Sequence, residues 1–202
     1  MSTLRTTNIT HPSSASNNIV LNSDGSTTIA TLAATDITAT TIQGIIKSGT
    51  AVSASSTAVD FTGIPSWVKR ITVLIADVST NSTNACLMQF GSSGTIQTTN
   101  YKARNNFVGG NNLTSTSGFP WGVNGGAASN TFRGSFMCNL VDASTNVWVV
   151  NGCVEVQDGN ASSALTQGRV TLSGTLDILR LQAGTAGTET FDAGTVNIIY
   201  EG

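Results

Sequence analysis

From about residue 50 onward, apolar and polar residues alternate in short runs, which is the period of a β-strand with one buried face. In residues 68–76 this alternation places Ile71, Val73 and Ile75 on one face and Leu74 on the other. Similar runs recur roughly every 8–12 residues and are separated by Gly, Asn and Ser turns, a spacing typical of β-sandwiches. No segment sustains a helical pattern. The sequence therefore predicts an all-β fold with an antiparallel, jelly-roll-like β-sandwich at residues 49–202.

Several of these runs also predict which side chains form the core. The expected inward-facing positions are Phe132, Phe136, Cys138, Leu140, Trp148, Val150, Val154, Val156, Val196, Ile198 and Tyr200. Residues 169–182 contain two strands, and Ser173-Gly174 between them is a candidate tight hairpin. These positions predict a core that is built from many short strands.

The first 48 residues differ in composition from the rest of the chain. Phe61 is the first aromatic residue, and the apolar residues before it come in short, widely spaced groups. The sequence NSDGS, at residues 22–26, is a turn signal between two short strand-like runs. So thin a segment cannot bury its own apolar residues, so either it is disordered or several copies of the chain or a partner bury them. We therefore expect residues 1–48 to be an extended attachment and oligomerisation segment that contacts other chains more than its own sandwich. Its candidate contact residues are Ile9, His11, Pro12, Ile19, Leu21, Ile29, Leu32, Ile37 and Ile42.

Residues 98–131 form a long stretch that is rich in Gly and Asn and has no clear strand pattern. Long irregular insertions in compact domains are usually functional or interfacial, and aromatic rings on Gly, Asn and Ser loops are typical of recognition surfaces. The sequence therefore predicts a long loop here, for which receptor contact and packing between subunits are both open. The receptor-binding candidates are Tyr101, Arg104, Phe107, Phe119 and Trp121.

Composition argues against several functional classes. The net charge is −2 and only 10% of residues are charged, so there is no basic surplus for nucleic acid. The single histidine, His11, and three scattered cysteines make neither a Ser-His-Asp triad nor a zinc site. No apolar run approaches the length of a membrane span. We therefore expect no enzyme activity, metal, cofactor or membrane insertion, and the odd number of cysteines favours synthesis in a reducing cytoplasm.

Several segments of the chain resemble tail fibre proteins of tailed bacteriophages, especially those of marine and cyanobacterial phages. The resemblance covers strand and turn motifs at residues 10–27, 59–83, 116–119, 145–152, 170–181 and 191–202. It implies a homotrimeric virion protein, located in the tail fibre and made in the host cytoplasm. Its N-terminus would attach to other phage tail or baseplate proteins. Its C-terminal sandwich would recognise a host-surface receptor, and the neutral hydroxyl and amide surface suits a polysaccharide.

Other functional readings remain open from the sequence. A structural role is the first alternative, as a head decoration protein, head fibre or baseplate connector without receptor binding. A polysaccharide depolymerase is the second alternative, against which it counts that no carboxylate pair stands out for glycosidase chemistry. A bacterial adhesin or lectin domain is a third, weaker alternative.

Overall fold

The computed structural model describes residues 8–9, 19–21, 23, 27–29, 46–108, 110, 112–123, 127–157 and 162–202. The chain divides into two units, Met1–Ile42 and Gln43–Gly202. The boundary lies earlier than the expected one after residue 48. The reason is that Ile46–Ser48 forms strand β4, which pairs with the last strand of the sandwich. Residues 46–48 therefore belong to the sandwich, and assigning them to the attachment segment was wrong.

The N-terminal unit contains a small antiparallel sheet in its described part. Strands β1 (Asn8–Ile9), β2 (Ile19–Leu21) and β3 (Thr27–Ile29) pair in the order β1-β2-β3. The register joins Leu21 to Thr27 and Ile19 to Ile29, so the chain reverses between β2 and β3, as the turn signal predicts. The contact candidates Ile9, Ile19, Leu21 and Ile29 lie on these strands. The remaining candidates lie outside the described residues: His11, Pro12, Leu32, Ile37 and Ile42.

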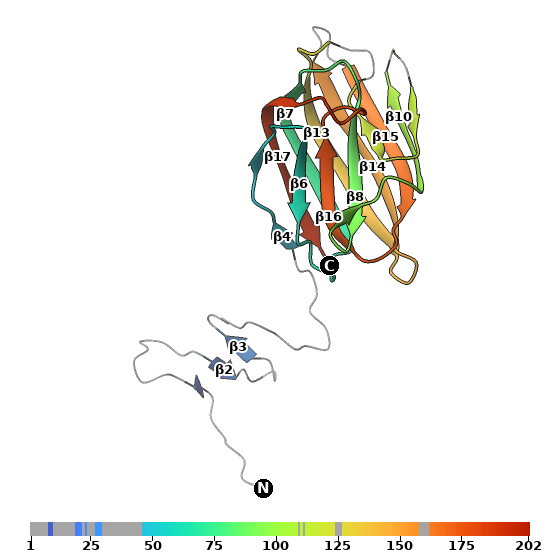
Figure 1. The fold of residues 1–202 in the computed structure, drawn as a ribbon. Helices are drawn as coiled ribbons and strands as arrows, with labels where there is room; N and C mark the ends of the chain where they lie inside the picture. The colour runs from blue at the N-terminus through green and yellow to red at the C-terminus, as the bar shows by residue number, and fades with distance from the viewer. Residues whose placement is uncertain are drawn as a thin grey trace. The chain divides into compact units, whose positions relative to one another are not determined.

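The second unit is a sandwich of two antiparallel sheets (Figure 1). The larger sheet has the strand order β11-β10-β15-β14-β13-β7-β17-β4, and β5 also pairs with β17. Its strands are β11 (Leu113–Ser115), β10 (Tyr101–Phe107), β15 (Ser162–Thr171), β14 (Val147–Gln157), β13 (Thr131–Asp142), β7 (Arg70–Thr80), β17 (Phe191–Glu201), β4 (Ile46–Ser48) and β5 (Val52–Ser53). The smaller sheet has the order β12-β8-β16-β6, with β9 paired to β8. Its strands are β12 (Phe119–Trp121), β8 (Cys86–Ser92), β16 (Leu176–Gln182), β6 (Ala58–Thr62) and β9 (Thr95–Ile96). The all-β antiparallel sandwich is thereby confirmed.

The expected hairpin at Ser173-Gly174 is wrong. The two strands that these residues connect, β15 and β16, belong to opposite sheets. Both edges of β15 are already paired, with β10 and β14, so the chain that follows it pairs elsewhere. It crosses to the smaller sheet, where β16 lies between β8 and β6.

The expected long loop at residues 98–131 is also wrong. This stretch contains β10, β11 and β12, and β10 and β12 pair with strands of different sheets. The strand pattern is weak here, because β10 buries the polar Asn105 beside Tyr101 and Ala103 and because β11 and β12 have only three residues each. Pro120 is tolerated in β12 because this strand lies at the edge of its sheet, where a missing N–H leaves no ladder bond unmade.

The core between the sheets is rich in aromatic side chains. The ring centroid of Phe119 lies 5.4 Å from that of Phe90 and 5.1 Å from that of Tyr101. Trp121 packs edge-on against Phe132 at 5.7 Å. Such tilted pairs add to the free energy gained by burial of the rings. The expected inward-facing positions of the sequence are confirmed as core or as side chains packed against it.

Tyr101 joins the two sheets through a buried hydrogen bond. The Tyr101 hydroxyl, on β10, accepts a bond of 2.8 Å from the backbone N–H of Phe90 on β8. The hydroxyl is 3.3 Å from the Phe90 carbonyl oxygen, to which it donates. Burial raises the pKa of this phenol well above its ordinary value, so it stays neutral and can donate.

We expect Tyr101→Phe to lower the free energy of unfolding by about 1–3 kcal/mol, because it leaves the buried Phe90 N–H without its partner. Urea unfolding followed by tryptophan fluorescence measures the change. Tyr200→Phe is the matched control, since the Tyr200 hydroxyl makes no hydrogen bond among the described residues. Equal stability of the two variants would contradict this role for the Tyr101 hydroxyl.

Glu189 organises the connection between β16 and β17. Burial by itself raises the pKa of its carboxyl group, but hydrogen bonds to the carboxylate outweigh that effect. The Asn84 amide donates to Oε1 at 2.7 Å, and the Thr188 N–H donates to Oε2 at 3.2 Å. The pKa of Glu189 therefore lies below its usual value of 4.5. The hydrogen bonds to the ionised Glu189 carboxylate thus stabilise the folded state at neutral pH.

Because the folded-state pKa of Glu189 is lowered, its contribution to stability is complete above pH 4.5 and is lost as the pH falls through the lower, folded-state value. We expect Glu189→Gln to destabilise the protein at pH 7, and the difference from wild type to shrink as the pH is lowered below 4.5. Thermal unfolding between pH 3 and pH 7 measures it. The control is Glu155→Gln, whose side chain is 44% exposed; the same pH dependence in both variants would refute the assignment to Glu189.

Candidate functional site

The aromatic receptor-binding candidates are buried. Tyr101, Phe119 and Trp121 are at most 1% exposed, and each contacts other rings of the core. Phe107 is partly buried and packs against the same core. Assigning these rings to receptor contact was wrong, because the strands that replace the expected loop turn them inward. Among the candidates on this stretch, Arg104 is the exposed side chain.

The same outcome holds for the other aromatic residues. None of the seven Phe, two Tyr and three Trp side chains is exposed, and all of them belong to the part of the chain that the structure describes. Trp67 and Tyr200 are partly buried and form a tilted pair with centroids 5.9 Å apart. The exposed surface of the described sandwich is therefore formed by polar and aliphatic side chains.

The outer face of the larger sheet presents a row of side chains that runs across the strands. Cross-strand pairing joins, in order, Thr72, Met137, Asn151, Gln167, Arg104 and Thr114. We call these six residues the outer row. Neighbouring strands lie about 4.8 Å apart, so the row spans roughly 24 Å from β7 to β11. It combines a thioether, two amides, a guanidinium and two hydroxyls, all of them outside the core.

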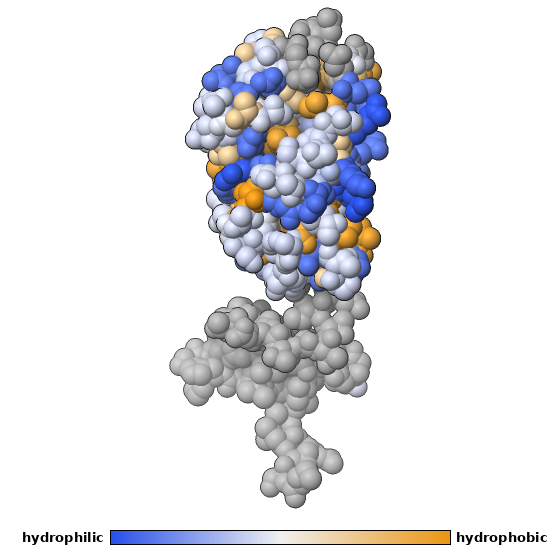
Figure 2. All heavy atoms as spheres, turned by 45° about the vertical axis from the view of Figure 1, so that its right-hand side comes forward, coloured by the Kyte–Doolittle hydropathy of each residue, from blue (hydrophilic) through white to orange (hydrophobic). Residues whose placement is uncertain are grey.

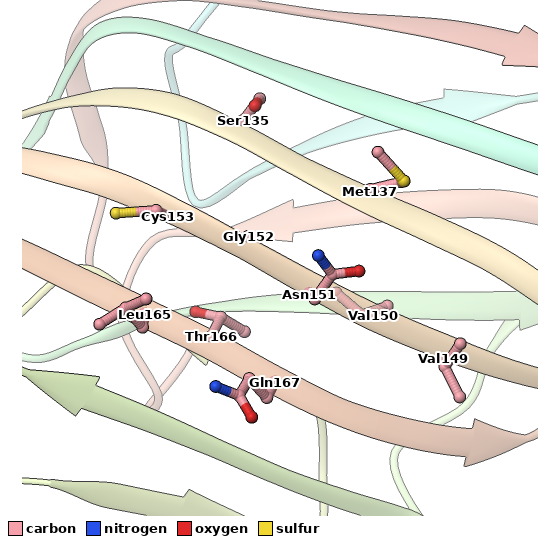
Figure 3. A pocket seen from close by; sticks show the side chains of 10 residues that line it. All are labelled: Ser135, Met137, Val149, Val150, Asn151, Gly152, Cys153, Leu165, Thr166 and Gln167. Atoms are coloured by element: carbon pink, nitrogen blue, oxygen red, sulfur yellow. The ribbon is translucent and has the colours of Figure 1, made fainter.

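Two hollows lie along the outer row. The first, of about 560 Å³, is lined by residues of β13, β14 and β15 that include Ser135, Met137, Asn151, Cys153 and Leu165 (Figure 3). The second, of about 780 Å³, is lined by residues of β10, β11 and β15 that include Lys102, Arg104 and Thr114. Gln167 lines both, so the hollows adjoin. Together they form a shallow surface that is long enough for an extended ligand.

The surface around these hollows is mixed in character. Met137 and Leu165 are about 40% exposed, whereas their neighbours Asn151 and Gln167 are polar. Figure 2, which views the sandwich from another side, shows a similar mixture there, with hydrophilic and hydrophobic residues in small separate groups. Such a surface offers hydrogen bonds together with small apolar contacts, which suits a ligand that itself mixes hydroxyls and C–H groups.

Several carboxylates of the sandwich make structural contacts. Asp60 and Glu201 bind Arg180 and Arg70, and Asp77 binds Arg133. Asp142 accepts hydrogen bonds from Ser144 and Thr145, which lower its pKa and fasten the turn between β13 and β14. In the described part of the chain, no group of three His, Cys, Asp or Glu side chains is placed to hold a metal ion. No carboxylate side chain is among the residues that line the two hollows.

Comparisons with protein-family models, with curated proteins and with solved structures found no match. Within the described residues, there is also no helix with the length and apolarity needed to cross a membrane. The outer row and the sequence motifs are therefore the features of this chain that bear on its function.

The outer row was missed from the sequence, apart from Arg104. Its members are ordinary surface residues on strands that are adjacent in space and far apart in the chain. The alternation shows that Met137 and Asn151 point away from the core, but the order of the strands decides that they are neighbours. Only strand order could have identified this row.

We expect Trp121→Ala to lower the free energy of unfolding by about 3–5 kcal/mol, because it removes a fully buried ring from the core. Arg104→Ala should change it by less than about 0.5 kcal/mol, because this side chain is exposed and makes no ion pair among the described residues. Denaturant unfolding of both variants measures the contrast. A Trp121 variant of wild-type stability would contradict its place in the core.

Proposed function

We propose that the protein is a virion tail fibre protein of a tailed bacteriophage that binds a host-surface polysaccharide without cleaving it. The sequence resemblance supports the tail-fibre role, and the outer row is the observation that supports polysaccharide binding. Amides, hydroxyls and a guanidinium lie in one line across the sheet, beside two adjoining hollows. Polysaccharides present hydroxyls to hydrogen-bond and C–H groups to pack on aliphatic side chains such as Met137 and Leu165.

In this proposal the N-terminal unit attaches the protein to the tail or baseplate and makes it a homotrimer. Its short strands are too small to bury much apolar surface within one chain. Three linked sandwiches raise the effective concentration of the outer row at a cell surface, so each copy can bind weakly. The low net charge keeps repulsion between identical subunits small.

The burial of the aromatic rings also keeps a second candidate function open. Without exposed rings for stacking on sugars, a structural head decoration, head fibre or baseplate connector fits the sandwich as well. In that case the outer row would contact another virion protein. Immunogold electron microscopy separates the two, because tail-fibre labelling supports the first candidate and capsid labelling the second.

We expect the full chain to bind a subset of bacterial capsular and lipopolysaccharide glycans on an array. The double variant Asn151→Ala/Gln167→Ala should bind at least tenfold more weakly, because it removes the two central amides of the outer row. The matched control, Thr57→Ala/Thr62→Ala, alters exposed side chains at the edge strand β6 and should bind as wild type. Absence of glycan binding by the wild-type chain, or equal loss in both variants, would overturn the receptor-binding proposal.

We further expect light scattering to give three times the chain mass of 20.7 kDa. Replacement of Ile19 and Leu21 by Ser should lower this mass, since these residues of β2 are the expected contacts between chains. A monomeric wild-type chain would remove the basis for avidity.

A further inference from the structure

Three basic residues lie close together on the outer face of the larger sheet, and one of them, Arg104, belongs to the outer row. Lys102 and Arg104 lie two residues apart on β10, so both point to the outer face of the sheet. Arg169 on β15 is directly opposite Lys102 in the register. All three side chains are exposed. We call Lys102, Arg104 and Arg169 the basic cluster.

The basic cluster is unlike the other arginines of the sandwich. Arg180 is bound to Asp60 by two hydrogen bonds of 2.7 Å, and Arg70 and Arg133 likewise contact Glu201 and Asp77. Among the residues that the structure describes, no carboxylate lies within ion-pair distance of the basic cluster. Like charges directly across a β-ladder are unfavourable, so the pairing of Lys102 with Arg169 does not serve stability. The excess is local, because the whole chain has a net charge of −2.

The basic cluster adjoins a hollow that can hold a ligand. Lys102 and Arg104 line the hollow of about 780 Å³, together with Thr114, Thr116 and Gln167. Arg104 stands between Gln167 and Thr114 in the cross-strand register. A guanidinium fork binds a carboxylate or sulfate through two parallel hydrogen bonds, and a lysine adds a point charge. Hydroxyl and amide groups on both sides supply partners for the uncharged part of such a ligand.

We propose that the basic cluster selects an acidic polysaccharide, whose anionic groups bind at Lys102, Arg104 and Arg169 while its hydroxyls bind along the outer row. This inference rests on the proposed function and adds the charge class of the receptor. Charge complementarity points to an anionic ligand, since three exposed cations gather here and none has a carboxylate partner among the described residues. The hydroxyl and amide neighbours favour an acidic glycan, which offers hydroxyls beside its charges, over a phosphate polymer such as DNA.

The test measures binding of the full chain to four polymers by biolayer interferometry at 50 and 300 mM NaCl. The probes are polygalacturonate, which carries carboxylates, dextran sulfate, which carries sulfates, neutral dextran, and double-stranded DNA. We expect binding to polygalacturonate that weakens at least tenfold at the higher salt concentration, and little binding to dextran. Binding to dextran sulfate alone supports the anionic-glycan assignment and identifies sulfate as the recognised group. Tighter binding to double-stranded DNA than to both acidic polymers overturns it.

Matched variants separate a site from general charge. Lys102→Gln/Arg104→Gln removes two charges of the basic cluster and should weaken binding at least tenfold. Lys47→Gln/Lys69→Gln removes two charges at exposed positions elsewhere and should bind as wild type. Equal loss in the two variants refutes the site. The thermal midpoint of the cluster variant should equal or exceed that of wild type; a lower midpoint assigns the cations a structural role and also overturns the proposal.

Failure of this inference is distinguishable from failure of the proposed function. If the wild-type chain binds neutral glycans on the array but neither acidic polymer, the charge class is wrong and the receptor-binding proposal stands. If it binds no glycan and no acidic polymer, both proposals are wrong.

Discussion

The sandwich depends on an aromatic core that fills the space between its two sheets. Rings from both sheets meet there, and Tyr101 adds a polar tie by bonding the backbone of Phe90 in the opposite sheet. A chain with only 6% aromatic residues uses almost all of them for this purpose. Because the core takes up the aromatic side chains, few of them are left for the surface.

That limit shapes how the protein can recognise a partner. Because the rings are turned inward, the outer face of the larger sheet is built from short polar, aliphatic and basic side chains. Pairing between neighbouring strands aligns six of these side chains as the outer row. The first hollow is lined by short side chains such as Ser135 and by longer ones such as Met137 and Leu165. Binding would then come from many weak contacts along an extended ligand, which is compatible with a multivalent fibre.

The arginines of the sandwich fall into two groups, those that contact a carboxylate and those of the basic cluster, which do not. Arg70, Arg133 and Arg180 each contact a carboxylate from another strand and support the ladders between strands. The basic cluster has no such partner in the described sandwich, although acidic residues outnumber basic ones in the chain. A local surplus of one sign in a nearly neutral protein is a signature of binding more than of folding, which is why we assign the cluster to a ligand.

The sequence by itself determined the fold class, the inward faces of the strands and the turn between β2 and β3. Alternation and turn residues act over a few positions, so these features can be read locally, as at Ile71, Val73 and Ile75. Only the tertiary structure decided which strands are neighbours. It placed β15 and β16 in opposite sheets. It also formed the paired strands β10, β11 and β12 within residues 98–131, and these strands bury Tyr101, Phe119 and Trp121. The candidate site depended on the same step, because Asn151, Gln167 and Arg104 become one row only through pairing between distant segments. The alternation of apolar and polar residues in one strand shows which face is buried, but it does not show which distant strand will pair with it.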